Sequence, residues 1–312
     1  KFHPSISTKM YAVSARGGLF ISNNAGNTWT MAPGCDPLTN GLRFASVCVD
    51  YNNDQIIYLG TGDLNYYYTG KGVYKSTNGG TTFAASNTGI SARLVAEIII
   101  DPSNSNVLLA ATDAGVYKST NAGATWTLKS ASNLQCSQML LKANAGTRTV
   151  YVSTYSGFYR SLDFGDSWTQ ITTGIYVPAG YTGANGIRIA VTPADSNRVY
   201  LAMVAKKGTV FQSTDGGSTF STMKDSHNPN LTAYSNDTTT DGGQGDYNYM
   251  LAADPVNADV LYLGAHMFWK STNGGSTWSQ LTNWWAELHT DMHWVRVNPY
   301  NTNEVWTAND GG

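Results

Sequence analysis

The chain has few charged residues. Only 13% of its 312 residues are Asp, Glu, Lys or Arg, against about 25% in typical soluble domains. The formal net charge is −2, so the sequence has neither the basic field that attracts nucleic acid nor an acidic tail. The polar surface must instead come from Ser, Thr, Asn and Gly, a composition common among secreted β proteins.

Cysteine and long apolar runs are also scarce. The three cysteines, Cys35, Cys48 and Cys136, are odd in number and lack the spacing of a metal site. Cys35 and Cys48 could form a disulfide in an extracellular protein, or Cys48, which lies in an apolar run, could be a buried thiol. No run approaches the ~18 apolar residues of a membrane-spanning helix. The sequence therefore predicts no membrane span.

One phrase, Ser-x-Asn/Asp-x-Gly-x-Thr/Ser-Trp/Phe, occurs six times. Its copies begin 54, 43, 42, 52 and 58 residues apart, at Ser22, Ser76, Ser119, Ser161, Ser213 and Ser271. Repeats of roughly 40–50 residues are typical of propeller blades. Alternating apolar runs around each copy, such as "LVAEIIIDP" and "GVYKS", indicate four short strands separated by turns.

The repeated phrase itself has the composition of a turn. Ser, Asn and Asp side chains bond to nearby backbone, and the constant Gly allows a positive φ. We predict that each copy staples a hairpin between the third and fourth strands, that its final aromatic packs between blades, and that it has no catalytic role. The residues with this structural role are Ser22, Asn24, Gly26, Trp29, Ser76, Asn78, Gly80, Phe83, Ser119, Asn121, Gly123, Trp126, Ser161, Asp163, Gly165, Trp168, Ser213, Asp215, Gly217, Phe220, Ser271, Asn273, Gly275 and Trp278.

These repeats predict one all-β propeller over residues 1–312, built from four-stranded blades. Seven blades are expected, of which six and half of a seventh are visible. The expected blades span approximately residues 1–40, 41–90, 91–133, 134–175, 185–224, 246–283 and 289–312. "KFHP" (Lys1–Pro4) is expected to be the tail of a first strand. Because no phrase follows the last two strands, we expect the polypeptide to continue beyond Gly312.

The phrase resembles the Asp-box, or bacterial neuraminidase (BNR), repeat of sialidase-like and sortilin-like propellers. A narrower resemblance, to secreted BNR-like propellers of Bacteroidetes-type bacteria, rests on "YLGTGD" (Tyr58–Asp63), "GGQGDYNYMLAADP" (Gly242–Pro255), "HTDMHWVRVNP" (His289–Pro299) and "ANDGG" (Ala308–Gly312). The resemblance implies secretion or a bacterial cell-surface location, with type IX secretion in many members. It leaves the function open, because sialidases, xyloglucan hydrolases, receptors and photosystem assembly factors share the repeat. The arginine motif of sialidases and the Gly-rich opening of xyloglucan hydrolases are not recognisable here.

The segment "HTDMH" is the densest cluster of titratable residues. His289, Asp291 and His293 alternate, so they are expected on one side of a strand near the channel mouth, where Asp310 could approach them. Two His and one or two carboxylates suit Zn²⁺ or another transition metal. The alternatives are a hydrogen-bonded polar cluster and general acid/base chemistry. No other cofactor is expected.

Four carboxylates are weak candidates for a catalytic pair. Asp63, Asp246, Asp291 and Asp310 lie at predicted strand ends or loops, and glycoside hydrolysis requires two carboxyl groups. The alternative is that these side chains only bond to turns and strand ends.

Aromatic clusters are the candidate ligand-binding residues. Tyr66, Tyr67 and Tyr68 lie in an insertion of the second blade, and Trp284 and Trp285 lie in the loop before the seventh. Exposed aromatic rings suit sugar faces or a protein partner, whereas buried ones would only pack blades.

A long polar segment, Lys224–Asp246, separates the fifth and sixth units. It exceeds the length of a simple turn, so it is expected to be a functional loop or a mobile insertion. Asn230 and Asn236 lie in glycosylation-type sequons within it.

Together these features predict a secreted or cell-surface propeller that binds a polysaccharide or a surface protein, with no nucleic-acid partner. One alternative is a glycoside hydrolase that uses carboxylates at the channel mouth. Another is a structural component or cargo of an extracellular assembly, with other chains as partners.

Overall fold

The structure is a computed structural model. It describes residues 1–35, 38, 42–63, 68, 70–90, 94–144, 148–155, 157–176, 186–225, 228–234, 243–245, 247–282 and 288–311. The chain divides into two compact units, one formed by Lys1–Met139 and Ser161–Trp168 and the other by Leu140–Arg160 and Thr169–Gly312. Helix is limited in the described residues to short turns, which include η1 (Pro33–Cys35) and α2 (Ala205–Gly208).

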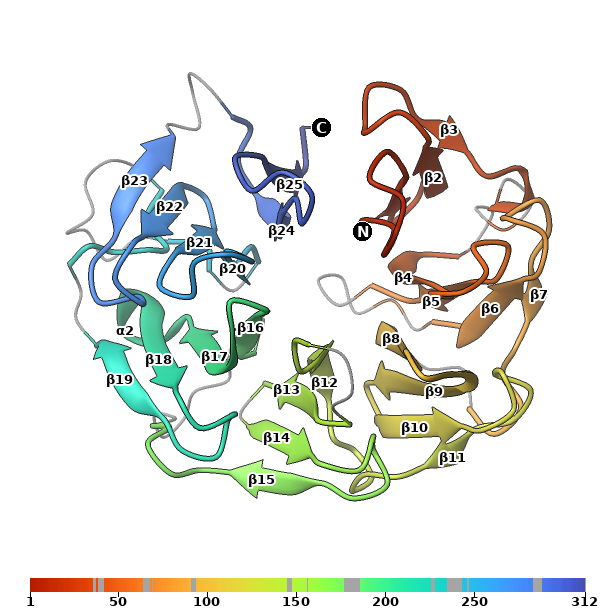
Figure 1. Ribbon diagram of the computed structural model, residues 1–312, viewed down its shortest axis with the longest axis horizontal. Helices are drawn as coiled ribbons and strands as arrows, with labels where there is room; N and C mark the ends of the chain where they lie inside the picture. Colours follow the sequence, from red (N-terminus) through yellow and green to blue (C-terminus); the bar gives the residue numbers. More distant parts are fainter. Residues whose placement is uncertain are drawn as a thin grey trace. The chain divides into compact units, whose positions relative to one another are not determined.

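Antiparallel sheets follow one another along the chain (Figure 1). The first three sheets comprise β1 (Met10–Ser14), β2 (Gly18–Ser22), β3 (Thr30–Met31); β4 (Phe44–Val49), β5 (Ile57–Thr61), β6 (Val73–Ser76), β7 (Ala84–Ala85); and β8 (Val95–Asp101), β9 (Asn104–Thr112), β10 (Gly115–Ser119), β11 (Thr127–Leu128). The next three comprise β12 (Cys136–Leu141), β13 (Val150–Thr154), β14 (Phe158–Ser161), β15 (Thr169–Ile171); β16 (Arg188–Thr192), β17 (Asp195–Met203), β18 (Thr209–Ser213), β19 (Ser221–Lys224); and β20 (Met250–Ala253), β21 (Leu261–Gly264), β22 (Phe268–Ser271), β23 (Ser279–Thr282). The last sheet pairs β24 (Met292–Val297) with β25 (Val305–Asn309).

The sheets have the meander order of propeller blades. In every four-stranded sheet, neighbours in the chain are neighbours in the sheet. The first sheet has three strands, and Phe2 adds an isolated bridge to Met10 on the edge of β1 that does not face β2. His3 N donates to Lys9 O at 2.9 Å, so "KFHP" takes the place of a first strand, as predicted. The predicted all-β propeller, with a partial seventh blade, is confirmed.

The repeated phrase forms the predicted staple in all six copies. In the third copy, Ser119 Oγ accepts hydrogen bonds from Asn121 N at 3.3 Å and Gly123 N at 2.9 Å. Asn121 Oδ1 accepts one from Thr125 N at 2.8 Å. The same bond from the Gly amide to the Ser hydroxyl occurs in the other five copies. These bonds span two to four residues, so the turn depends on local sequence alone.

The aromatic that ends the phrase packs against the preceding sheet. Trp126 is 4% exposed and shares a core cluster with Tyr58 and Ile90, and its Nε1 donates to Ser86 O at 2.8 Å. Phe220 meets Phe158 edge-on, with ring centroids 5.3 Å apart. The predicted packing between blades is confirmed at these positions, where apolar burial is a main stabilising contribution.

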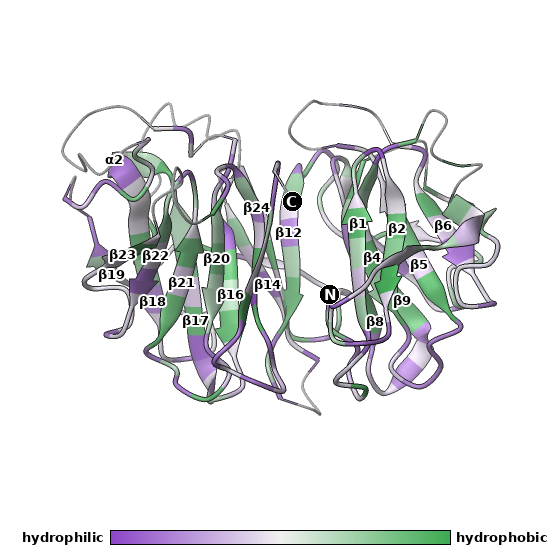
Figure 2. Cartoon of the chain, turned by 90° about the horizontal axis from the view of Figure 1, so that it is seen from above, coloured by the Kyte–Doolittle hydropathy of each residue, from purple (hydrophilic) through white to green (hydrophobic). Residues whose placement is uncertain are grey.

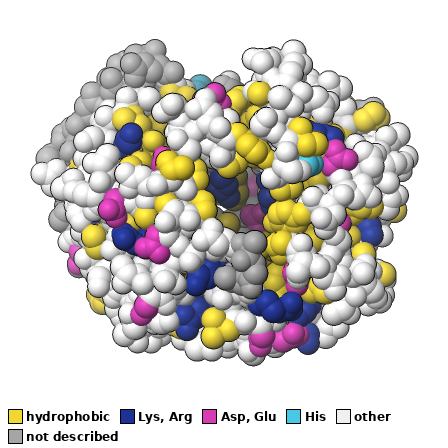
Figure 3. Space-filling view, in the orientation of Figure 1, with side chains coloured by type: hydrophobic (Ala, Val, Ile, Leu, Met, Phe, Trp, Pro, Cys, Tyr) yellow, Lys and Arg dark blue, Asp and Glu magenta, His cyan; other side chains and the backbone are white. Residues whose placement is uncertain are grey.

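Hydropathy follows the strands. In Figure 2 the middles of the strands are hydrophobic and the turns are mainly hydrophilic. On the face shown in Figure 3, most of the surface is backbone and side chains that are neither hydrophobic nor titratable, with charges scattered among them. This agrees with a surface built from Ser, Thr, Asn and Gly. None of the described helices has the length and hydropathy needed to cross a membrane.

All three cysteines are free thiols in buried positions. Cys35, Cys48 and Cys136 are 0%, 3% and 1% exposed. Burial raises the pKa of each thiol, and that of Cys136 reaches about 12. Of the two states considered for Cys35 and Cys48, the structure has the unpaired one.

Candidate functional site

Two carboxylates lie at one end of the last sheet. In the antiparallel pair β24–β25, Met292 is opposite Asn309. Asp291 precedes Met292 and Asp310 follows Asn309, so both side chains start from the same end of the ladder. The strand register therefore brings together two of the acids singled out in the sequence.

The predicted alternation of His289, Asp291 and His293 along one strand is wrong. β24 begins at Met292, so the first two residues precede it. Asp291 has a φ of 63°, in the left-handed region that interrupts extended backbone and that non-Gly residues seldom adopt. Only His293 projects from the strand itself. Strained backbone of this kind often occurs at functional sites.

Asp310 is held by a histidine and a tyrosine. His293 Nε2 lies 2.9 Å from Asp310 Oδ1, and Tyr247 OH donates to Asp310 Oδ2 at 2.9 Å. The rings of Tyr247 and His293 meet edge-on, with centroids 4.8 Å apart. The side chains of His293 and Asp310 are 27% and 45% exposed. The predicted approach of Asp310 to His293 is confirmed, and the pair is accessible to a ligand.

Asp291 lies in a more enclosed set of donors. Its Oδ1 accepts hydrogen bonds from Gln244 Nε2 at 2.9 Å and Asn248 Nδ2 at 2.6 Å. Thr290 Oγ1 donates to its Oδ2 at 3.1 Å, and His266 Nδ1 is 3.6 Å from Oδ1. The Asp291 side chain is 20% exposed. The carboxylate is thus oriented by neutral donors. Tyr247 and Asn248, which are adjacent in the chain, bond to Asp310 and Asp291 respectively and so connect the two acids.

His266 is the least solvated titratable group beside Asp291. Its side chain is 12% exposed, and its ring meets Tyr234 edge-on at 5.2 Å. Burial lowers the pKa of His266 below its ordinary value, and the neighbouring Asp291 carboxylate opposes that shift. Near neutral pH the ring is therefore uncharged, and it fits the role of a neutral hydrogen-bonding group beside the acid.

His289 does not join either acid. Its Nδ1 lies 3.2 Å from Thr290 O, and a Cβ placed on Gly311 would lie 2.1 Å from His289 Cδ2. The histidine thus packs on the backbone of Gly311, where no larger residue fits. In the part of the chain that the structure describes, no group of three or more His, Cys, Asp or Glu side chains could hold a metal ion. The proposed ligands His289, Asp291, His293 and Asp310 are therefore not brought together as one metal site.

The other sequence candidates are only partly described. Asp63, in the first unit, forms a backbone bridge in which its N donates to Tyr68 O at 3.1 Å. The Tyr68 ring is 47% exposed and carries the Arg43 guanidinium 4.9 Å from its centroid. The remaining candidates, Tyr66, Tyr67, Asp246, Trp284 and Trp285, lie outside the described residues.

Part of the long segment between the fifth and sixth units belongs to the core. Leu231 is fully buried in the cluster that includes Tyr249 and Trp269, and its N donates to Lys207 O at 3.0 Å. Asn230 is also fully buried, and its Oδ1 accepts from Thr232 N and Oγ1 at 3.0 and 2.8 Å. The sequon at Asn230 therefore cannot carry a glycan on the folded chain. Asn236 lies outside the described residues.

Several residues that shape the site were not identified from the sequence. Gln244, Tyr247 and Asn248 approach the acids from the segment before β20, and His266 approaches from the turn between β21 and β22. The sequence signal for Gln244, Tyr247 and Asn248 is "GQGDYN", an irregular polar stretch next to an apolar strand. Only Asp246 in this stretch is a predicted site residue. His266, inside "GAHMF", gave no signal of its own.

Comparison with curated proteins finds sequence similarity to a xyloglucanase. No protein-family model matches the chain. A curated xyloglucanase of Hypocrea jecorina (strain QM6a) is 33% identical over 140 residues, which are 42% of this chain and 16% of the relative. The matched part is thus a small share of that xyloglucanase.

Solved structures extend the likeness to the whole chain. A GH74 enzyme from Niastella koreensis superposes with a TM-score of 0.69 at 21% identity, over 100% of this chain and 50% of that one. A GH74 xyloglucanase from Xanthomonas campestris gives a TM-score of 0.69 at 20% identity, with the same coverage. The chain spans about half the length of these two structures. It is a β-propeller whose fold resembles the propellers of GH74 xyloglucanases.

Proposed function

We propose that the chain is a carbohydrate-active propeller that hydrolyses a β-glucan-type polysaccharide such as xyloglucan. The observation that carries the proposal is the pair Asp291 and Asp310, at one end of the β24–β25 ladder. Glycoside hydrolysis needs two carboxyl groups with different roles. The 33% identity with a xyloglucanase over 140 residues supports the choice of substrate class.

The surroundings of the two acids suit different roles. Asp310 is 45% exposed and shares a hydrogen bond with His293, so it can exchange a proton with bound substrate and with solvent. We assign it the general acid, which protonates the departing glycosidic oxygen. Asp291 accepts bonds from Gln244 and Asn248, and these donors hold its carboxyl group in a fixed orientation. We assign it the second carboxylate of the pair.

The deciding experiment measures release of reducing ends from xyloglucan by the purified chain. Asp310→Asn and Asp291→Asn should each lower kcat by about 100-fold or more, the usual contribution of a general acid or base. Asp195→Asn is the matched control, because this acid forms a surface ion pair with Arg198, and it should retain activity. Absence of turnover in the unaltered chain, or full activity in both variants of the pair, would refute the proposal.

The second candidate is a binding module without turnover. It is favoured by the hydrogen bonds that already occupy both Asp291 oxygens, which leave that carboxylate few acceptor sites for chemistry. Calorimetric binding of xyloglucan without release of reducing ends would establish this function in place of hydrolysis.

A polysaccharide substrate of this class lies outside the cell, so the proposal includes a secreted or cell-surface location. Fractionation of the producing cells with an antibody against the chain tests this. A purely intracellular signal would exclude such a location.

A further inference from the structure

The copies of the repeated phrase differ in the residue that follows their Asn or Asp. The second and sixth copies contain Asn78-Gly79 and Asn273-Gly274, whereas the first and third have Ala after the Asn. Asn is a thermolabile residue, and Asn before Gly is especially prone to deamidation. The reason is that a glycine has no side chain and a flexible backbone, so its amide nitrogen easily reaches the Asn side chain. The second and sixth turns are therefore chemically the most vulnerable copies.

Deamidation exchanges ammonia for water within the chain. The backbone nitrogen of Gly79 attacks Cγ of Asn78, the new C–N bond closes a succinimide ring, and the side-chain nitrogen leaves as ammonia with the proton of the Gly79 amide. Water then adds to either ring carbonyl and opens the ring. Opening at the side-chain carbonyl gives Asp, and opening at the backbone carbonyl gives isoaspartate, in which the main chain runs through Cβ.

In the folded chain both reacting groups of the second phrase are engaged. Gly79 N donates to Gln55 O at 3.0 Å. Asn78 Oδ1 accepts hydrogen bonds from Ser76 Oγ at 3.0 Å and Thr82 N at 2.9 Å, and Asn78 Nδ2 donates to Thr82 Oγ1 at 2.9 Å. Attack on Cγ requires both groups to rearrange, so these hydrogen bonds must break first.

The sixth phrase has the same set of hydrogen bonds. Gly274 N donates to Asp259 O at 2.9 Å. Asn273 Oδ1 accepts from Ser271 Oγ at 3.0 Å and Thr277 N at 2.9 Å, and Asn273 Nδ2 donates to Thr277 Oγ1 at 2.8 Å. The two Asn-Gly turns are thus equally well held by the fold.

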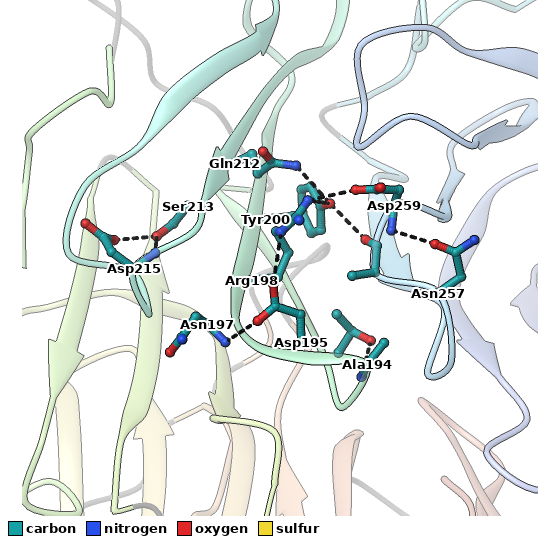
Figure 4. Close-up of polar contacts among 12 residues, drawn as sticks. Ala194, Asp195, Asn197, Arg198, Tyr200, Gln212, Ser213, Asp215, Asn257 and Asp259 are labelled. Atoms are coloured by element: carbon teal, nitrogen blue, oxygen red, sulfur yellow. Dashed lines mark hydrogen bonds and ion pairs between the residues drawn. The ribbon is translucent and has the colours of Figure 1, made fainter.

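An Asp at this place fits the turn, whereas an isoaspartate does not. In the fifth phrase Ser213 Oγ donates to Asp215 Oδ1 at 2.7 Å (Figure 4), and Thr219 N donates to the same oxygen at 3.0 Å. Asp163 accepts the same kinds of bond in the fourth phrase. Isoaspartate adds a backbone atom between the Ser and the Gly of the phrase, which breaks the spacing of their hydrogen bond.

We propose that Asn78 and Asn273 are deamidation sites controlled by their own turns. The folded turn suppresses the reaction, and opening of the turn permits it. The Asp that forms can refold into the phrase, while the isoaspartate cannot. Because the change is irreversible, the second and sixth turns keep a chemical record of opening and limit how often the chain can unfold and refold intact.

Peptide mapping by mass spectrometry measures the reaction, on native chain and on chain unfolded in guanidinium, at mildly alkaline pH. In the unfolded chain Asn78 and Asn273 should deamidate much faster than Asn24 and Asn121, which precede Ala. Folding should slow Asn78 and Asn273 by about tenfold or more, since several hydrogen bonds must break together. Equal rates for the Gly and Ala copies when unfolded, or no slowing on folding, would overturn the proposal.

A glycine variant tests the chemistry without requiring a folded chain. Gly79→Ala should slow deamidation of Asn78 in guanidinium, because the added Cβ hinders ring closure, and Asn273 in the same molecule should be unaffected. An unchanged rate at Asn78 would contradict attack by the Gly79 nitrogen. The other two Asn-Gly pairs, which begin at Asn40 and Asn185, lie outside the described residues and are mapped separately.

A serine variant tests control by the turn. Ser76→Ala removes the hydroxyl that donates to Asn78 Oδ1 and accepts from Gly80 N. In native chain, whose folding circular dichroism checks, it should speed deamidation of Asn78 more than that of Asn273. Equal acceleration at the two sites would show that global unfolding controls the reaction, and no acceleration at Asn78 would show that the staple gives no protection. Either result would overturn the proposal.

Discussion

At the scale of single residues, the third position of the repeated phrase is either Asp or Asn. Asp163 accepts hydrogen bonds from Ser161 Oγ and from Ser167 N and Oγ. Burial alone would raise the pKa of Asp163, but these hydrogen bonds outweigh it and lower the pKa to about 2. The pKa of Asp215 is lowered for the same reason. The other four copies use Asn, which offers the same acceptor oxygen without a charge.

This difference predicts a pH effect on stability. An Asp in an unfolded chain has a pKa of about 3.9, above its value in the folded phrase. The contribution of Asp163 and Asp215 is therefore present above about pH 4 and lost as the pH falls toward 2. The double variant Asp163→Asn/Asp215→Asn should show a flatter fall of the free energy of unfolding over this range, measured by urea denaturation.

The reverse substitution is the control for that prediction. Asn273→Asp places the acid in the sixth phrase, whose Asn already receives a bond from Thr277 N. It should steepen the fall of stability below pH 4. Identical acid profiles for the original chain and both variants would show that these carboxylates do not titrate with folding.

At the scale of elements, blades are joined by side chains that cross from one sheet to the next. Trp126 is the clearest example, because it is 4% exposed and also donates a hydrogen bond. Trp126→Ala should lower the free energy of unfolding by about 3–5 kcal/mol through the cavity it leaves. Trp126→Phe should cost less, since it retains most of the apolar contact.

Chemical denaturation with intrinsic fluorescence from the remaining Trp residues measures both variants. Leu162→Ala is the control, because Leu162 is 64% exposed and its loss should change stability by about 0.5 kcal/mol or less. An equal effect of the Trp126→Ala and Leu162→Ala variants would contradict the proposed packing role.

Two lysines that lie over tyrosine rings give a second prediction at this scale. Lys75 Nζ lies 5.3 Å from the Tyr58 ring centroid, and Lys270 Nζ lies 5.4 Å from that of Tyr262. Lys75→Met removes a charged donor from Ala122 O and should lower the free energy of unfolding by about 1–2 kcal/mol. Lys270→Met is matched in repeat position and ring contact but removes no hydrogen bond among the described residues, so its cost should be smaller. Thermal melts of the two variants compare them directly, and a larger loss for Lys270→Met would contradict a stabilising role of the hydrogen bond from Lys75 to Ala122 O.

At the scale of the whole molecule, the thiols report on opening of the fold. Cys35, Cys48 and Cys136 are buried in the folded chain, and their raised thiol pKa values leave little reactive thiolate. We predict that a disulfide reagent such as DTNB reacts slowly with the native chain and titrates all 3 cysteines once guanidinium unfolds it. A thiol that reacts rapidly under native conditions would contradict the burial.

The site was less predictable than the fold. Asp291 and Asp310 are among the acids predicted from the sequence, and the contact between His293 and Asp310 was also expected. The left-handed conformation of Asp291 was not, because alternation of polar residues does not show where a strand begins. Gln244 and His266 also lacked a signal, since their role depends on contacts across the fold rather than on neighbouring residues.

The sequence by itself determined the strands, the phrase turns and hence the propeller. The reason is that both signals are local. Apolar and polar residues alternate along a strand with a period of two residues, and the hydrogen bond from Gly123 N to Ser119 Oγ spans only four residues. Tertiary structure alone decided what surrounds the acids. Gln244 is 47 residues from Asp291 and Tyr247 is 63 from Asp310, and such pairs meet only after the register of every intervening strand is set. Local turns could therefore be predicted from the sequence, whereas the chemical environment of Asp291 and Asp310 depends on how the sheets assemble.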